Sequence, residues 1–162
     1  MKKNPLSAFL NADYPAWKGL TALTDKQLKK ILGEPTLTEN VHLGYYAAQK
    51  WSFPLSVASG GLYAYIREGE VIMIEAMATS HYDLISRLPP PCGEKVQEIL
   101  LTGAYVSEQL YCQNGLILSV AAFFDTTRSP QIVRIRSIQP FDNPNAFDTR
   151  FYKAFEDQMS WQ

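Results

Sequence analysis

A helical spacing of hydrophobic residues occurs near the N-terminus. The apolar residues lie at positions i, i+3 and i+4, on one side of a predicted helix. They are Leu28, Ile31 and Leu32. Thr24 and Gln27 have the types and spacing of a capping box, which predicts the start of this helix. Gly33 and Pro35 predict its end. A short helix is therefore expected between Thr24 and Gly33.

Most of the following chain shows the two-residue alternation of β-strands. Two β-rich runs surround a polar turn with Gly69, and Asn114-Gly115 is typical of a tight turn between antiparallel strands. Ile and Arg alternate over residues 132–138, which predicts an edge strand with its charges in solvent. The predicted strands are residues 49–53, 62–66, 71–76, 105–112, 116–124 and 132–138.

Two further segments have helical spacing. Residues 94–101 carry apolar side chains that fit a helix, although a strand stays open, and residues 145–158 fit a C-terminal helix. We therefore expect an α+β fold, with about six antiparallel strands, short N-terminal helices and a C-terminal helix. Residues 1–162 are expected to form one domain, with a possible internal repeat of two α-βββ units over residues 24–86 and 94–158.

Composition is that of a packed globule, with 46% hydrophobic and 19% charged residues. The 15 basic residues nearly balance the 16 acidic ones, which argues against nucleic acid or an anionic membrane as a partner. The N-terminus lacks the continuous apolar stretch of a secretion signal, so a cytoplasmic location is expected. In that location Cys92 and Cys112 would be reduced.

Few residues suit catalysis. The only histidines are His42 and His81, and no known metal, phosphate or cofactor motif occurs, so we expect no cofactor, no metal site and no catalytic residues. Cys92 is the best nucleophile candidate because it precedes a possible helix, and His81 or His42 would be its base. A hydrolase or transferase that uses Cys92 remains an alternative, but the chain is more typical of a protein that is not an enzyme.

Aromatic residues gather in the first β-rich region. Tyr and Trp combine a large apolar surface with a polar group, which makes them frequent anchors of protein interfaces. The candidate protein-binding residues are Tyr45, Tyr46, Trp51, Tyr63 and Tyr65. These rings could instead fill the core. A third possibility is that the sheet encloses a cavity for a small ligand.

The segment LTDKQLKKILGEP resembles the helix-to-strand transition of the β-lactamase inhibitor protein and of the BamE-like assembly lipoproteins. This resemblance implies a concave antiparallel sheet that binds another protein. A lipidation cysteine near the N-terminus is absent from the sequence. The expected function is therefore that of a non-enzymatic protein-binding module, such as an inhibitor or an immunity-type protein, whose partner is another protein and whose oligomeric state stays open.

Overall fold

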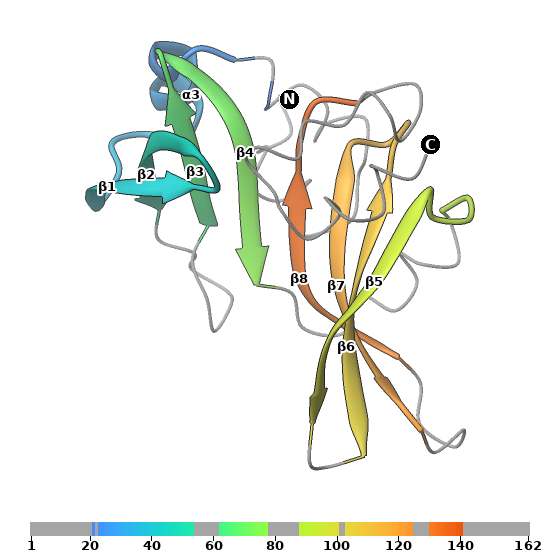
Figure 1. Cartoon of the computed structure of the whole chain (residues 1–162). Helices are drawn as coiled ribbons and strands as arrows, with labels where there is room; N and C mark the ends of the chain where they lie inside the picture. Colours follow the sequence, from blue (N-terminus) through green and yellow to red (C-terminus); the bar gives the residue numbers. More distant parts are fainter. Residues whose placement is uncertain are drawn as a thin grey trace.

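The computed structural model describes residues 21, 23–53, 62–77, 88–100, 103–124 and 130–140. These residues form one helix and one antiparallel sheet of eight strands (Figure 1). The elements are α3 (Asp25–Leu32), β1 (Leu37–Leu43), β2 (Tyr46–Phe53), β3 (Leu62–Arg67), β4 (Glu70–Met77), β5 (Gly93–Leu100), β6 (Ala104–Tyr111), β7 (Leu116–Phe123) and β8 (Gln131–Ser137).

Helix α3 begins and ends where the sequence predicts. The Thr24 side chain accepts a hydrogen bond from the backbone of Gln27, and the Gln27 side chain accepts one from the backbone of Thr24. These bonds satisfy two backbone donors that the first helical turn leaves without partners. Gly33 ends the helix with a positive φ of 85°. Leu28 is fully buried and fixes the helix against the sheet.

The strand order is β1-β2-β3-β4-β8-β7-β6-β5. The first four strands form one meander, and the last four form a second meander of reversed spatial order. The two meanders meet where β4 pairs with β8, at the middle of the sheet (Figure 1). This junction pairs four residues of each strand, whereas β6 and β7 pair along eight residues. The junction is thus a short ladder that joins two longer sets of strands.

The two faces of the sheet carry separate hydrophobic clusters. We call the face that packs against Leu28 the helix face; its cluster includes Trp51 and Phe53 of β2. The opposite face, which we call the network face, has a cluster that includes Tyr65, Met73 and other residues of both meanders. Alternation along each strand sends neighbouring side chains to opposite faces. Both faces of the central strands are therefore buried.

The predicted α+β class with about six strands is wrong, because the described residues form eight strands and a single short helix. Strand β1 was missed, and β5 was expected as a helix with a strand left open. The side chains of β1 are mostly exposed on both faces, so its sequence has no strong hydrophobic alternation. In β5 the pairing register shifts between Val96 and Glu98, which interrupts the two-residue period and imitates helical spacing.

The prediction of an edge strand over residues 132–138 is also wrong. Strand β8 lies at the centre of the sheet, between β4 and β7, and its Arg136 is buried. A charged residue that alternates with isoleucine can face solvent or a buried charge of opposite sign, and the pattern alone does not distinguish the two. The helix predicted over residues 145–158 lies outside the described residues. The single domain and the internal repeat stay predictions.

Cys92 and Cys112 form a disulfide, so the expectation of reduced thiols is wrong. Cys92 immediately precedes β5, and its backbone N–H donates to the carbonyl of Leu110 in β6. This pairing holds the two Cα atoms 6.1 Å apart, within the range that a disulfide spans. The bond thus ties the start of the edge strand β5 to the end of β6.

We expect loss of this disulfide to lower the free energy of unfolding by about 3 kcal/mol, because it closes a loop of 20 residues in the unfolded chain. Urea unfolding of the oxidised and reduced protein measures the effect. The double variant Cys92→Ser/Cys112→Ser is the control, and reductant should leave its midpoint unchanged. Equal midpoints for the oxidised and reduced native chain would contradict this expectation.

Candidate functional site

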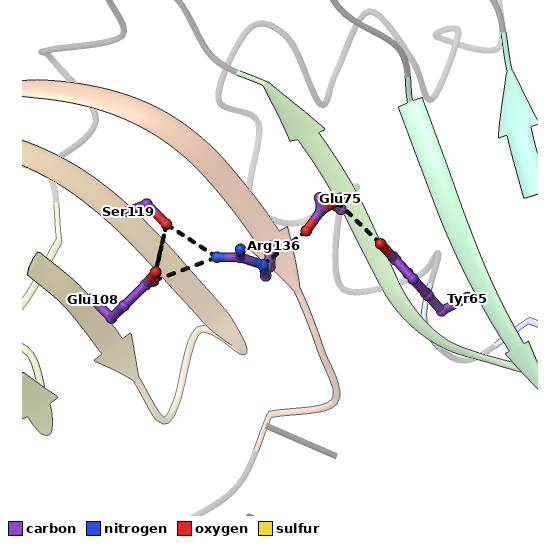
Figure 2. A network of polar contacts seen from close by, with 5 residues as sticks. All are labelled: Tyr65, Glu75, Glu108, Ser119 and Arg136. Carbon is purple, nitrogen blue, oxygen red and sulfur yellow. Dashed lines mark hydrogen bonds and ion pairs between the residues drawn. The ribbon is translucent and has the colours of Figure 1, made fainter. Parts of the chain in front are cut away.

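A chain of polar contacts crosses the network face from β3 to β6 (Figure 2). Arg136 lies at its centre, and its Nε donates to Glu75 Oε2 of β4 over 2.8 Å. Its Nη1 lies 3.4 Å from Glu108 Oε2 of β6 and donates to Ser119 Oγ of β7 over 3.0 Å. We call these residues, together with Tyr65 of β3, the Arg136 network.

The ends of the network are also hydrogen bonded. Tyr65 Oη donates to Glu75 Oε1 over 3.2 Å. Ser119 Oγ donates to the Glu108 carboxylate, at 2.9 and 3.0 Å from its two oxygens, and accepts from Arg136. Burial raises the pKa of Tyr65 well above its usual range, and the neighbouring negative charge and hydrogen bond of Glu75 raise it further. Tyr65 is therefore a neutral hydrogen-bond donor at neutral pH.

The Arg136 network has a structural role. All five side chains are buried, and Glu75 stands directly opposite Arg136 across the junction of β4 and β8. A buried charge is costly unless it is paired and hydrogen bonded, so each carboxylate requires the guanidinium. The contacts extend over five adjacent strands and therefore connect the two meanders.

A second group of side chains on the network face reaches solvent. Tyr46 and Lys50 of β2 lie beside Tyr63 and Arg67 of β3, and all four are half-buried. The Arg67 guanidinium lies 3.8 Å from the centre of the Tyr46 ring, and Lys50 Nζ lies 4.2 Å from the centre of the Tyr63 ring. We call these four residues the Tyr–cation surface. Stacking holds both cations against rigid rings.

The five predicted binding residues thus lie in different environments. Trp51 and Tyr65 are 5% and 7% exposed, on opposite faces of the sheet. Tyr46 and Tyr63 belong to the Tyr–cation surface, and Tyr45 is 63% exposed in the turn before β2. The structure brings Tyr46 and Tyr63 to one face, whereas Trp51 packs in the core beneath α3. The cationic partners Lys50 and Arg67 were missed because their contacts with the rings depend on strand register.

A groove of about 730 Å³ adjoins the Tyr–cation surface. It lies between the β1–β2 hairpin, the start of α3 and the turn between β3 and β4. Tyr45, Tyr46 and Arg67 line it, together with His42 and Asp25. The groove is open to solvent and combines aromatic, basic and acidic groups. Its volume lies within the range of small-ligand sites.

The thiol mechanism considered for Cys92 is excluded in this oxidised state, because the disulfide with Cys112 removes the nucleophile. His42 lines the groove, and His81 lies outside the described residues. Among the described residues, no cluster of His, Cys, Asp and Glu could hold a metal ion. In the same part of the chain, no helix has the length and hydrophobicity to cross a membrane.

No known protein family and no curated protein matches the chain. Several solved structures are similar to it, including the following three. A cysteine-rich secretory protein from Staphylococcus aureus has 12% identity and a TM-score of 0.42, with 74% of this chain and 44% of that chain covered. An extracellular protein containing an SCP domain from Bacillus anthracis has 13% identity, a TM-score of 0.44 and the same coverage. This chain therefore spans less than half of either protein.

The third similar structure is a candidate β-lactamase inhibitor protein from Streptococcus mutans, with 7% identity and a TM-score of 0.35. The alignment covers 78% of this chain and 96% of that one. The resemblance expected from the segment LTDKQLKKILGEP stays a prediction, because this comparison does not test that segment. All three TM-scores are too low to support a conclusion about function.

We expect Arg136→Met to lower the free energy of unfolding by about 3 to 5 kcal/mol, because Glu75 and Glu108 would keep buried charges without the guanidinium. Arg134→Met is the matched control, since Arg134 lies two residues away on the same face and is only half-buried. Its expected loss is below about 1 kcal/mol. Chemical unfolding of both variants provides the comparison, and equal losses would contradict a special role of Arg136.

We expect stability to fall in alkaline solution as Tyr65 and Tyr111 ionise. Burial, assisted by the charge of Glu94, raises the pKa of Tyr111 from 10.0 to about 12. The native state then binds more protons than the unfolded state, so this stabilisation is complete below pH 10 and is lost as pH rises through 12. Unfolding measured against pH, with tyrosinate absorbance, tests the expectation. Constant stability across that window would argue against it.

Proposed function

We propose that this protein is a non-enzymatic protein-binding module that contacts its partner through the Tyr–cation surface. The observation that carries the proposal is the pairing of Tyr46 with Arg67 and of Tyr63 with Lys50 on one half-exposed sheet face. Tyrosine and arginine are enriched among the residues that contribute most to protein interfaces.

The geometry of these pairs favours binding. Each cation already lies against a ring, so a partner that covers the surface restricts fewer side-chain rotamers than it would with free lysine and arginine. The buried Arg136 network fixes the strand behind Tyr63, because Tyr65 lies two residues along β3 and is bonded to Glu75. Lys50 and Arg67 place two positive charges on the surface. Arg67 also lies 4.0 Å from the exposed Glu68, whose place an acidic group of the partner would take. An inhibitor or immunity-type role is compatible with this chemistry.

The cytoplasmic location stays a prediction, and the disulfide of Cys92 with Cys112 bears on it. Disulfides persist in oxidising compartments and are rare in the cytosol. The bond therefore supports a proposal that the protein works in an oxidising compartment instead. Blocking free thiols in intact cells before lysis tests this proposal: unblocked, paired cysteines support it, and two blocked cysteines favour the cytoplasm.

A small-ligand-binding protein is the second candidate function. The groove of about 730 Å³ beside Tyr45, Tyr46 and His42 supports it, because apolar and polar groups converge there. A ligand in the groove would contact the aromatic ring of Tyr46 and the charge of Arg67. This alternative shares two residues with the protein-binding proposal, but it requires no macromolecular partner.

We expect Tyr46→Ala and Tyr63→Ala each to weaken partner binding at least about tenfold, as is typical of interface anchors. A partner captured from the host organism is identified, purified and titrated against the variants by calorimetry. Tyr105→Ala is the matched control, because Tyr105 is also a half-buried tyrosine with a side-chain contact, to the Phe124 ring, but lies on β6 in the other meander. Unchanged affinity of the Tyr46 and Tyr63 variants, with native stability retained, would rule out this surface.

A further inference from the structure

Strand β1 is an edge of the sheet. It occupies one end of the strand order and pairs with β2 along all its residues, from Leu37 to Leu43, without a register shift. In the part of the chain that the structure describes, no strand lies on its other side (Figure 1). An edge strand presents backbone N–H and C=O groups that can pair with another strand.

The two edges of the sheet differ in how they are protected. Strand β5, at the opposite end, has a register shift between Val96 and Glu98. A bulge in an edge strand hinders further strand pairing. Strand β1 has one charged residue, Glu39, contains no proline, and its register is continuous. β1 is therefore the edge that can accept another strand.

The side chains of β1 are accessible. Residues 37–40 and His42 are exposed, and Leu37 has 52% of its surface in contact with solvent. Val41 and Leu43 are half-buried and pack against the hydrophobic cluster of the network face. Alternation places Leu37 on that same face. The edge thus ends in an apolar side chain that a neighbouring strand would cover.

We infer that β1 pairs with β1 of a second copy of this chain, antiparallel and centred on Asn40. This register uses the whole strand and places no like charges opposite each other. A register centred on Glu39 would place the two Glu39 carboxylates opposite each other, which is unfavourable. A register centred on Val41 would leave Leu37 and Thr38 of each copy without a residue of β1 opposite them. The opposed pairs are Leu37 with Leu43, Thr38 with His42, Glu39 with Val41, and Asn40 with itself.

The self-pairing has a consequence for the network face. Leu37 of each copy would lie against Leu43 of the other, so the apolar cluster would continue across the interface. A two-fold axis perpendicular to the sheet leaves the same face of both copies on one side. The dimer would therefore present two Tyr–cation surfaces side by side. The inference itself requires no partner protein and stands apart from the proposed function.

Cross-linking through Asn40→Cys tests the register. In the proposed pair the two Cα atoms at position 40 would be about 4.5 to 5.5 Å apart, within disulfide range. The two Cα atoms at position 42 would be about 14 Å apart, because residue 42 of each copy faces residue 38 of the other. His42→Cys should therefore not cross-link. Both native cysteines are already paired, so they add no background. We expect a disulfide-linked dimer from Asn40→Cys, none from His42→Cys, and one from mixed Thr38→Cys and His42→Cys chains.

The association state is the second measurement. Light scattering of the native chain should give twice the monomer mass, and Asn40→Lys should give monomers because two lysines would face each other. Gln131→Lys, which adds the same charge at another exposed strand position, should remain dimeric. A native chain that stays monomeric at high concentration, or equal cross-linking of Asn40→Cys and His42→Cys, would overturn the inference. A monomer that binds a different protein through β1 would overturn it as well.

Discussion

The buried guanidinium of Arg136 is the group on which the joining of the two meanders depends. The ladder between β4 and β8 pairs four residues of each strand. The β1–β2 ladder pairs seven, and the β6–β7 ladder pairs eight. Glu75 lies on one side of this junction, and Glu108 and Ser119 lie on the other. Because a buried carboxylate needs a cation, separation of the meanders would leave Glu75 without Arg136, whereas Glu108 would keep it. The ionic contacts thus reinforce the shortest part of the sheet.

The two faces of the sheet have different roles. The helix face packs Leu28 of α3 with Trp51 and Phe53 into an apolar core. The network face combines buried polar contacts at its centre with half-exposed Tyr–cation pairs near β1. The hydrogen bond of Tyr65 to Glu75 holds the strand that also carries Tyr63. The Tyr–cation surface therefore lies beside the edge strand β1.

The sequence predicted those elements whose signals are local. The capping box at Thr24, the turn at Gly69 and the strand after Gly115 all lie within a few residues of the structure that they specify. The sequence could not predict the pairing of β4 with β8, because Glu75 and Arg136 are 61 residues apart. The position of β8 was mistaken for the same reason: only tertiary pairing decides whether an alternating arginine is buried.

The candidate site was predictable in part. The concentration of tyrosines identified the region of β2 and β3, but the exposure of each ring depends on which face it occupies. Tyr65 and Trp51 are buried, whereas Tyr46 and Tyr63 lie against cations. The disulfide was missed because Cys92 and Cys112 are separated by a hairpin whose first strand was assigned helical spacing. Both errors concern contacts between strands, which composition does not encode.

Native-state hydrogen exchange tests most directly whether the Arg136 network makes the two meanders one cooperative unit. If it does, slow amides of β3 and β4 should open with the same free energy as those of β7 and β8, and that free energy should equal the one for global unfolding. Distinct opening free energies for the two sets of strands would contradict this account, because the meanders would then unfold independently.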